Sequence, residues 1–183
     1  MNASLLSDRL WPQSGFARNA ALAVLGTVIV AAAAQVNVPM LPIPMTLQSL
    51  AVLLIGAAYG ARLGAATLAL YALEGAIGLP VFAGFGSGVM LASFGYVLGF
   101  IAAAGVVGFL AERGWDRSPL KMFAAMLLGA AVLYVPGLLW LSAWVGAGKA
   151  VQFGLMPFLL GDIVKAAVAA LGFPAAWALL GRR

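Results

Sequence analysis

The stretch Pro157-Phe-Leu-Leu-Gly-Asp-Ile-Val-Lys165 places two opposite charges inside an apolar segment. From Pro157 up to the final two arginines, every residue except Asp162 and Lys165 is uncharged. In a helix, residues three positions apart lie on one face, so these side chains can reach each other and a common ligand. Charged groups within a membrane span are costly and usually face a bundle interior or cavity. The stretch therefore predicts a membrane helix that carries a polar site.

A salt bridge that only fixes helix packing is the alternative interpretation of Asp162 and Lys165. Removing two charges from water costs several kcal/mol per ion, and apolar residues would pack as well without that cost. We therefore favour a ligand site.

The composition of the whole chain indicates an integral membrane protein. Of the 183 residues, 64% are hydrophobic and 8% are charged, whereas an ordinary soluble domain has about 25% charged residues. The apolar segments have a helical period rather than the alternation of a membrane barrel. The chain has no cysteine and no histidine, which excludes thiol chemistry and the usual zinc and haem ligand sets. We expect neither a metal nor a cofactor.

Six apolar segments, separated by Gly/Pro-rich or charged turns, predict one all-α membrane domain over the whole chain, 1–183. The expected helices cover residues 17–35, 46–59, 63–78, 92–112, 120–145 and 157–180. The first segment is about 28 Å long as a helix, enough to span a bilayer and longer than the apolar part of a typical signal peptide. Thr46 is the expected N-cap of the second helix. The segments 36–45, 79–91 and 146–156 are expected to be loops.

The distribution of Lys and Arg predicts the orientation in the membrane. With the N-terminus inside, the cytoplasmic segments hold Arg9, Arg18, Arg62, Arg113, Arg117, Lys121, Arg182 and Arg183, and the outside loops hold Lys149. This bias predicts cytoplasmic termini and a multi-pass protein of the cell (inner or cytoplasmic) membrane. It also accounts for the sequence pI of about 10.1, so we expect no nucleic-acid partner.

The three expected outside loops are nearly uncharged and rich in Gly, Pro and aromatic residues, as in a lid over a site. Glu74, near the outer end of the third helix, is either a pocket residue or a side chain that reaches the interface. Aromatic residues on the facing segments are candidates for stacking on a small ring: Tyr71, Phe82, Phe85, Tyr96, Trp140 and Trp144.

No motif for ATP use or catalysis is evident. The sequence has no G-x-x-x-x-G-K-[ST] loop, and Gly84-Phe-Gly-Ser-Gly88 lacks the strand–helix context of a nucleotide site. Ser87 and Ser93 have no histidine to activate them, so we do not expect an enzyme. Uphill transport by such a chain would need a partner or an ion gradient.

Several motifs together resemble the BioY family, the biotin-specific substrate-binding (S) components of energy-coupling-factor (ECF) transporters. The most specific are Pro-Met-Thr-Leu-Gln at 44–48 and Gly-Asp-Ile-Val-Lys at 161–165. The others are Gln35-Val-Asn-Val-Pro39, Gly60-Ala-Arg-Leu-Gly-Ala65, the segment 70–84 and Gly95-Tyr-Val-Leu-Gly-Phe100. The resemblance covers residues 20–171 in order. One departure stands before Gly95, where many members read Gly-Pro-Thr-Gly and this chain has Leu91-Ala-Ser-Phe94.

The resemblance implies a six-helix S-component bundle with biotin bound near the outer face. It also implies a transmembrane coupling (T) subunit and two cytoplasmic ABC-type ATPases as partners. In such transporters small residues on the first helix meet the coupling subunit, which makes Ala23, Thr27 and Ala31 candidates. Packing within this chain explains their four-residue spacing equally well.

Carried over residue by residue, Asp162 and Lys165 match the polar pair of the family's last helix. The resemblance also places Thr46, Gln48, Tyr71 and Tyr96 at recurrent positions near the pocket, and Phe82 joins them as an aromatic candidate. Asp162 could accept hydrogen bonds from the ureido N–H groups of biotin. Lys165 could donate to a ligand oxygen, either ureido or carboxylate.

Three functions stay open at this point. We favour a biotin-binding transport component energised by other subunits. A self-sufficient secondary carrier for biotin or a related vitamin, driven by protons through Glu74 or Asp162, is the alternative. A structural subunit without a ligand is the third possibility.

Overall fold

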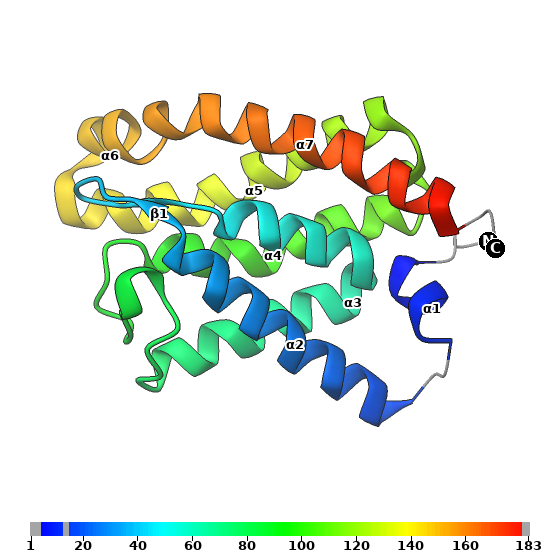
Figure 1. Cartoon of the computed structure of the whole chain (residues 1–183). Helices are drawn as coiled ribbons and strands as arrows, with labels where there is room; N and C mark the ends of the chain where they lie inside the picture. Colours follow the sequence, from blue (N-terminus) through cyan, green and yellow to red (C-terminus); the bar gives the residue numbers. More distant parts are fainter. Residues whose placement is uncertain (1–4, 13–14, 181–183) are drawn as a thin grey trace.

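The computed structural model describes residues 5–12 and 15–180, and most of them are helical (Figure 1). In chain order the elements are α1 (Leu6–Leu10), α2 (Phe16–Gln35), β1 (Asn37–Val38), β2 (Met45–Thr46), α3 (Gln48–Ala76), the 3-10 turn η1 (Ala83–Phe85), α4 (Phe94–Ala111), the 3-10 turn η2 (Trp115–Arg117), α5 (Pro119–Val145), α6 (Ala147–Gly154) and α7 (Met156–Leu180).

Five helical stretches of the described chain are long and apolar enough to cross a membrane: α2, α3, α4, α5 and the combined stretch Ala147–Leu179. Within α3, Gly60 has φ 82° and ψ 177°, a backbone conformation that is essentially restricted to glycine. The chain reverses there, so residues 48–59 and 61–76 form two adjacent arms (Figure 1). These arms correspond to the second and third helices that the sequence predicts.

The helix α4 lies at the centre of the bundle, with α3 on one side and α5 on the other (Figure 1). Outside these, α2 packs on α3 and α7 packs on α5. Small residues allow this close approach: a Cβ atom added to Gly56 of α3 would lie 2.5 Å from the carbonyl oxygen of Ala104 in α4. Without a hydrophobic effect between helices in lipid, such close packing is a main source of association.

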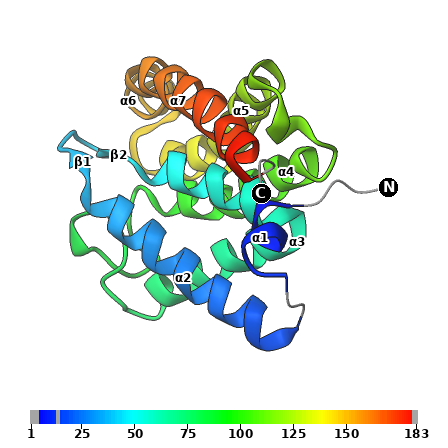
Figure 2. The same cartoon turned by 45° about the vertical axis from the view of Figure 1, so that its right-hand side comes forward.

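The connections gather at two ends of the bundle. We call the end that holds the β1–β2 hairpin, the loop with η1, and α6 the cavity end, and the opposite end, with α1 and η2, the α1 end (Figure 1). The last turns of α7 also lie at the α1 end, above α1 (Figure 2). There Trp177 of α7 donates a hydrogen bond of 2.6 Å to Asp116 in η2.

The structure corrects two loop predictions and shifts several helix ends. Residues 147–154, expected within a loop, form α6, whose Ala150 and Gly154 are buried against the bundle. The segment 36–45 contributes to a hairpin with Asn37 opposite Thr46, and its three prolines stand between the strands, where they interrupt no ladder. Because Thr46 belongs to β2, α3 begins at Gln48 with Leu47 as the N-cap, and Thr46 Oγ1 still accepts the Gln48 N–H at 3.2 Å.

Candidate ligand-binding site

A cavity of about 60 Å³ lies at the cavity end, bounded by the hairpin, the η1 loop, α3, α4, α5 and α7. On this measure one water needs about 10–15 Å³, so the space holds several waters. The walls combine polar and apolar side chains. The polar ones are Thr46, Gln48, Ser49, Ser93, Tyr96, Tyr134, Asp162 and Lys165, and the apolar ones include Ile43, Phe82, Val97, Phe100, Leu133 and Phe158.

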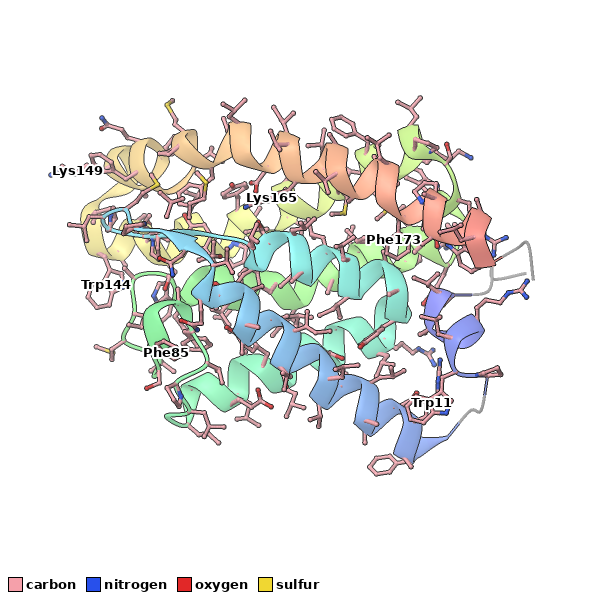
Figure 3. The ribbon with its side chains drawn as sticks, viewed as in Figure 1. Trp11, Phe85, Trp144, Lys149, Lys165 and Phe173 are labelled. Atoms are coloured by element: carbon pink, nitrogen blue, oxygen red, sulfur yellow. The ribbon has the colours of Figure 1, made fainter. Side chains whose placement is uncertain are left out.

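The two charges of α7 meet at this cavity, as the sequence predicts. Lys165 Nζ lies 3.4 Å from Asp162 Oδ1, and the side chains are only 13% and 10% exposed. The ammonium also donates to the Thr46 carbonyl at 2.9 Å and to Ser49 Oγ at 2.8 Å. Lys165 therefore lies between α7 and the start of α3 (Figure 3).

The carboxylate of Asp162 is held from two further helices. The Tyr134 hydroxyl on α5 donates to Oδ2, and Ser49 Oγ on α3 donates to Oδ1 at 3.4 Å. Three donors are therefore arranged around one carboxylate, which offsets the cost of burying it. Asp162 and Lys165 both lie on α7, so the bond between them does not connect α7 to another helix. Their partners on α3 and α5 provide that connection, and the two charges face the cavity together.

Gln48 links the cavity to the interior of the bundle. Its Nε2 donates to the Tyr71 hydroxyl at 2.7 Å, and that hydroxyl donates to the Val81 carbonyl at 2.8 Å. Thr46 Oγ1 donates to Gln48 Oε1 at 3.1 Å. Tyr71 is fully buried and does not line the cavity. Among the predicted site residues, Tyr71 therefore contacts the wall residue Gln48 and is not itself a wall residue.

Of the six aromatic candidates, Phe82 and Tyr96 line the cavity. The Tyr96 hydroxyl donates to the Gly154 carbonyl at 2.9 Å, which ties the end of α6 to α4. Phe82 packs edge-on against Tyr71, with ring centres 5.5 Å apart. Trp140 instead donates to the Leu91 carbonyl at 3.0 Å. Phe85 and Trp144 are exposed at the cavity end (Figure 3).

The segment Leu91-Ala-Ser-Phe94, where the sequence departs from the family pattern, borders the cavity through Ser93. Ser93 is the N-cap of α4. The Phe94 ring lies between Phe82 and Trp140, at centre distances of 6.1 and 5.7 Å. The departure therefore changes both a wall residue and the aromatic packing behind Phe82.

Sequence reasoning missed Ser49 and Tyr134, which hold the two charges. Tyr134 had a usable signal, because a hydroxyl in the middle of an apolar run needs a partner inside the bundle. In the predicted helix 46–59, Ser49 lies three residues after Thr46, a predicted site residue, and would share a face with it. Pairing them with Asp162 requires knowing that α3, α5 and α7 converge.

The remaining candidates lie away from the cavity. Thr27 is buried and donates within α2 to the Val24 carbonyl at 3.0 Å, while Ala23 and Ala31 are half-buried. The contact of these three residues with a coupling subunit stays a prediction. Glu74 is half-buried and is not a wall residue. Within residues 5–12 and 15–180, no group of three or more His, Cys, Asp or Glu side chains could hold a metal.

Comparisons with known proteins agree with the motifs. The model of the BioY family matches residues 2–182. A probable biotin transporter BioY of Pyrococcus horikoshii is 37% identical over 155 residues, 85% of this chain and 93% of the relative. The biotin transporter BioY of Thermotoga maritima is 36% identical over 149 residues, 79% of this chain and 87% of the relative.

A solved structure shares the fold. It is the S-component for biotin from an ECF-type ABC transporter, with a TM-score of 0.72 at 18% identity, covering 88% of this chain and 92% of that one. The named relatives are transport proteins, in line with the expectation that this chain is not an enzyme. With the family model matching nearly the whole chain, and with the Gly-Asp-x-x-Lys pair meeting in a cavity beside the hairpin and the η1 loop, this membrane protein belongs to the BioY family.

Proposed function

We propose that the chain binds biotin in this cavity and serves as the S component of an ECF-type vitamin transporter. The observation that carries the proposal is the placement of an acceptor, Asp162, and a cation, Lys165, side by side in a mostly apolar and aromatic cavity. A few polar groups that fix orientation within apolar walls are typical of small-molecule sites. The relatives named as biotin transporters supply the identity of the ligand.

The chemistry of biotin fits these groups. Its ureido ring has two N–H donors and one carbonyl, so Asp162 accepts from the ring while Lys165 donates to a ligand oxygen, through charge-assisted bonds. Phe82, Tyr96 and Phe158 line the same cavity and cover the apolar part of the ligand. Gln48, held by Thr46 and Tyr71, offers a further amide at the wall.

We further propose six spans with both termini in the cytoplasm of the cell. The spans are α2, the two arms of α3, α4, α5 and α7. The α1 end holds Arg9, Arg18, Arg113, Arg117 and Lys121, with Arg62 beside the Gly60 reversal, and the cavity end holds Lys149. Since basic loops stay inside, this orientation opens the cavity to the outside of the inner membrane.

The energy for uptake comes from other chains in this proposal. The sequence has no phosphate-binding loop, and the resemblance to S components implies a transmembrane coupling subunit and two cytoplasmic ATPases as the partners. Ala23, Thr27 and Ala31 are proposed contacts for the coupling subunit. Thr27 is already buried within this chain. The coupling subunit would therefore contact mainly the half-buried Ala23 and Ala31.

The test is biotin binding by the purified protein in detergent, without nucleotide, measured by calorimetry. We expect saturable binding that Asp162→Asn weakens about 100-fold, since hydrogen bonds to charged groups contribute about 1.5–3 kcal/mol each. The control is Glu74→Gln, another carboxylate-to-amide change, made outside the cavity. It should bind like the wild type, and equal affinity in both variants would overturn the site. Uptake by liposomes that contain this chain alone would instead favour the secondary carrier.

A further inference from the structure

A second opening lies behind the ligand cavity, on the membrane-facing side of the bundle. It is a groove of about 530 Å³ between α5 and α7, within the usual size range of ligand sites. Leu127, Ala131 and Leu138 line it from α5, and Leu159 and Ile163 line it from α7. Tyr134 and Asp162, whose side chains are bonded to each other, also line it.

The position of the groove along α5 shows which part of the bilayer surrounds it. The helix α5 runs over Pro119–Val145, about 40 Å at 1.5 Å per residue, and the groove occupies its middle portion, residues 127–138. The hydrocarbon core of a bilayer is about 30 Å thick, so this portion lies inside the core. The lipid outside the protein holds no water at that depth, and an empty groove on that side would forfeit the dispersion contacts of its walls. The occupant must therefore be a hydrocarbon chain.

A charge on α6, the helix that ends directly before the lining residue Leu155, indicates which kind of hydrocarbon chain fills the groove. Leu155 lines the groove just after α6, and α6 carries Lys149, which is exposed at the end of the molecule (Figure 3). No described residue pairs with the Lys149 ammonium. Lys149 follows the end of α5, where a lipid phosphate would lie. A phosphate is the complementary anion for an unpaired ammonium at a membrane interface.

We propose that the groove and Lys149 form a phospholipid site. One acyl chain fills the groove against Tyr134 and Asp162, and the phosphate lies beside Lys149. The chain keeps the back of the Asp162 carboxylate dry, on the side opposite the ligand cavity. This site is additional to biotin binding and needs no biotin for its test.

The experiment is native mass spectrometry of the full chain released from mild detergent, with Ala131→Trp as the variant that fills the groove. The wild type should keep one phospholipid, and Ala131→Trp should lose it. The matched control is Ala167→Trp, since Ala167 is also an exposed alanine on a spanning helix but does not line the groove. It should keep the lipid. Lys149→Ala should lower phospholipid retention several-fold while leaving retention of uncharged diacylglycerol unchanged.

Several outcomes would overturn the proposal. One is a wild type that carries detergent but no phospholipid. The others are a phospholipid retention in Ala131→Trp, or in Lys149→Ala, that equals that of the wild type. Ala131→Leu, a smaller filler, replaces the tryptophan variant if that one does not fold. As a second measurement, added phospholipid should raise the Tm of the delipidated wild type by several degrees and that of the filled variant by less.

Discussion

Asp162 at the cavity end and Asp116 at the α1 end are both buried carboxylates, at 9% and 1% exposure, but their surroundings differ. Asp162 receives donors from Tyr134, Ser49 and Lys165 and borders a cavity. Asp116 accepts from Trp177, and among residues 5–12 and 15–180 its Oδ1 atom has no hydrogen-bond partner. None of the cavities described above includes Asp116.

The comparison shows that a buried charge alone does not mark a binding site. At the α1 end the carboxylate joins η2 to the last turns of α7, where Arg117 also lies over the Trp177 ring at 4.6 Å. At the cavity end the carboxylate and the neighbouring ammonium face a space that a ligand can enter. Changes at the cavity end should therefore alter affinity, and changes at the α1 end should alter stability.

The largest effect is expected for Lys165→Met. It removes the cation beside Asp162 and its bonds to Thr46 and Ser49. We expect biotin affinity to fall about 100-fold, which corresponds to a loss of about 2.7 kcal/mol of binding free energy. Calorimetry in detergent measures it, with Lys149→Met as the matched control outside the cavity. A Kd within twofold of the wild type for Lys165→Met would remove the distinction between the two ends.

Trp177→Phe tests the α1 end. The variant keeps an aromatic ring under Arg117 but removes the donor to Asp116, and a buried acceptor left without its donor costs about 1–3 kcal/mol. We expect a lower Tm in detergent and unchanged biotin affinity. Trp144→Phe, at an exposed position at the cavity end, is the control and should leave the Tm in place. A change in affinity for Trp177→Phe would contradict the structural role of Asp116.

Much of the fold could be predicted because its determinants are local. Apolar segment lengths predict the spans, and Gly60 marks the reversal within α3. The α6 helix could not be foreseen, because the segment has modest helix propensity and its Ala150 and Gly154 are fixed by tertiary packing. The hairpin was also missed, since two-residue strands leave almost no periodic signal.

The site residues also divide into those that the sequence predicts and those that depend on the packing of helices. Asp162 and Lys165 are visible in the sequence because charge is rare in a span. Gln48, Thr46 and Tyr96 came from the family resemblance, Phe82 came from the search for aromatic residues, and all four line the cavity. Ser49 and Tyr134 depend on how α3, α5 and α7 converge, which neither spacing nor composition reveals.

Tyr134→Phe tests whether a hydrogen bond from α5 to Asp162 supports biotin binding. The variant removes the hydroxyl that donates to Asp162 Oδ2 and keeps the ring that packs against Tyr96 at 6.1 Å. We expect biotin affinity to fall about tenfold, the equivalent of about 1.4 kcal/mol. Tyr59→Phe, a half-buried tyrosine outside the cavity, should bind like the wild type. Equal affinity in the two variants would show that Asp162 needs no support from α5.

The smallest effect concerns pH and tests Asp116 without a ligand. Burial raises the pKa of Asp116 above its ordinary value of 3.8, although the Trp177 hydrogen bond and Arg117 act in the opposite direction. A carboxyl whose pKa is raised by folding favours the folded state below its unfolded pKa, and this contribution is lost as pH rises through the folded pKa. The amide of Asp116→Asn does not ionise in this pH range. The Tm of the wild type minus the Tm of Asp116→Asn should therefore decrease as pH increases above about 4. Thermal unfolding in detergent at a series of pH values measures the difference. A constant difference across that range would mean that the α1 end holds its carboxylate at no electrostatic cost, and that the contrast with Asp162 rests on the cavity alone.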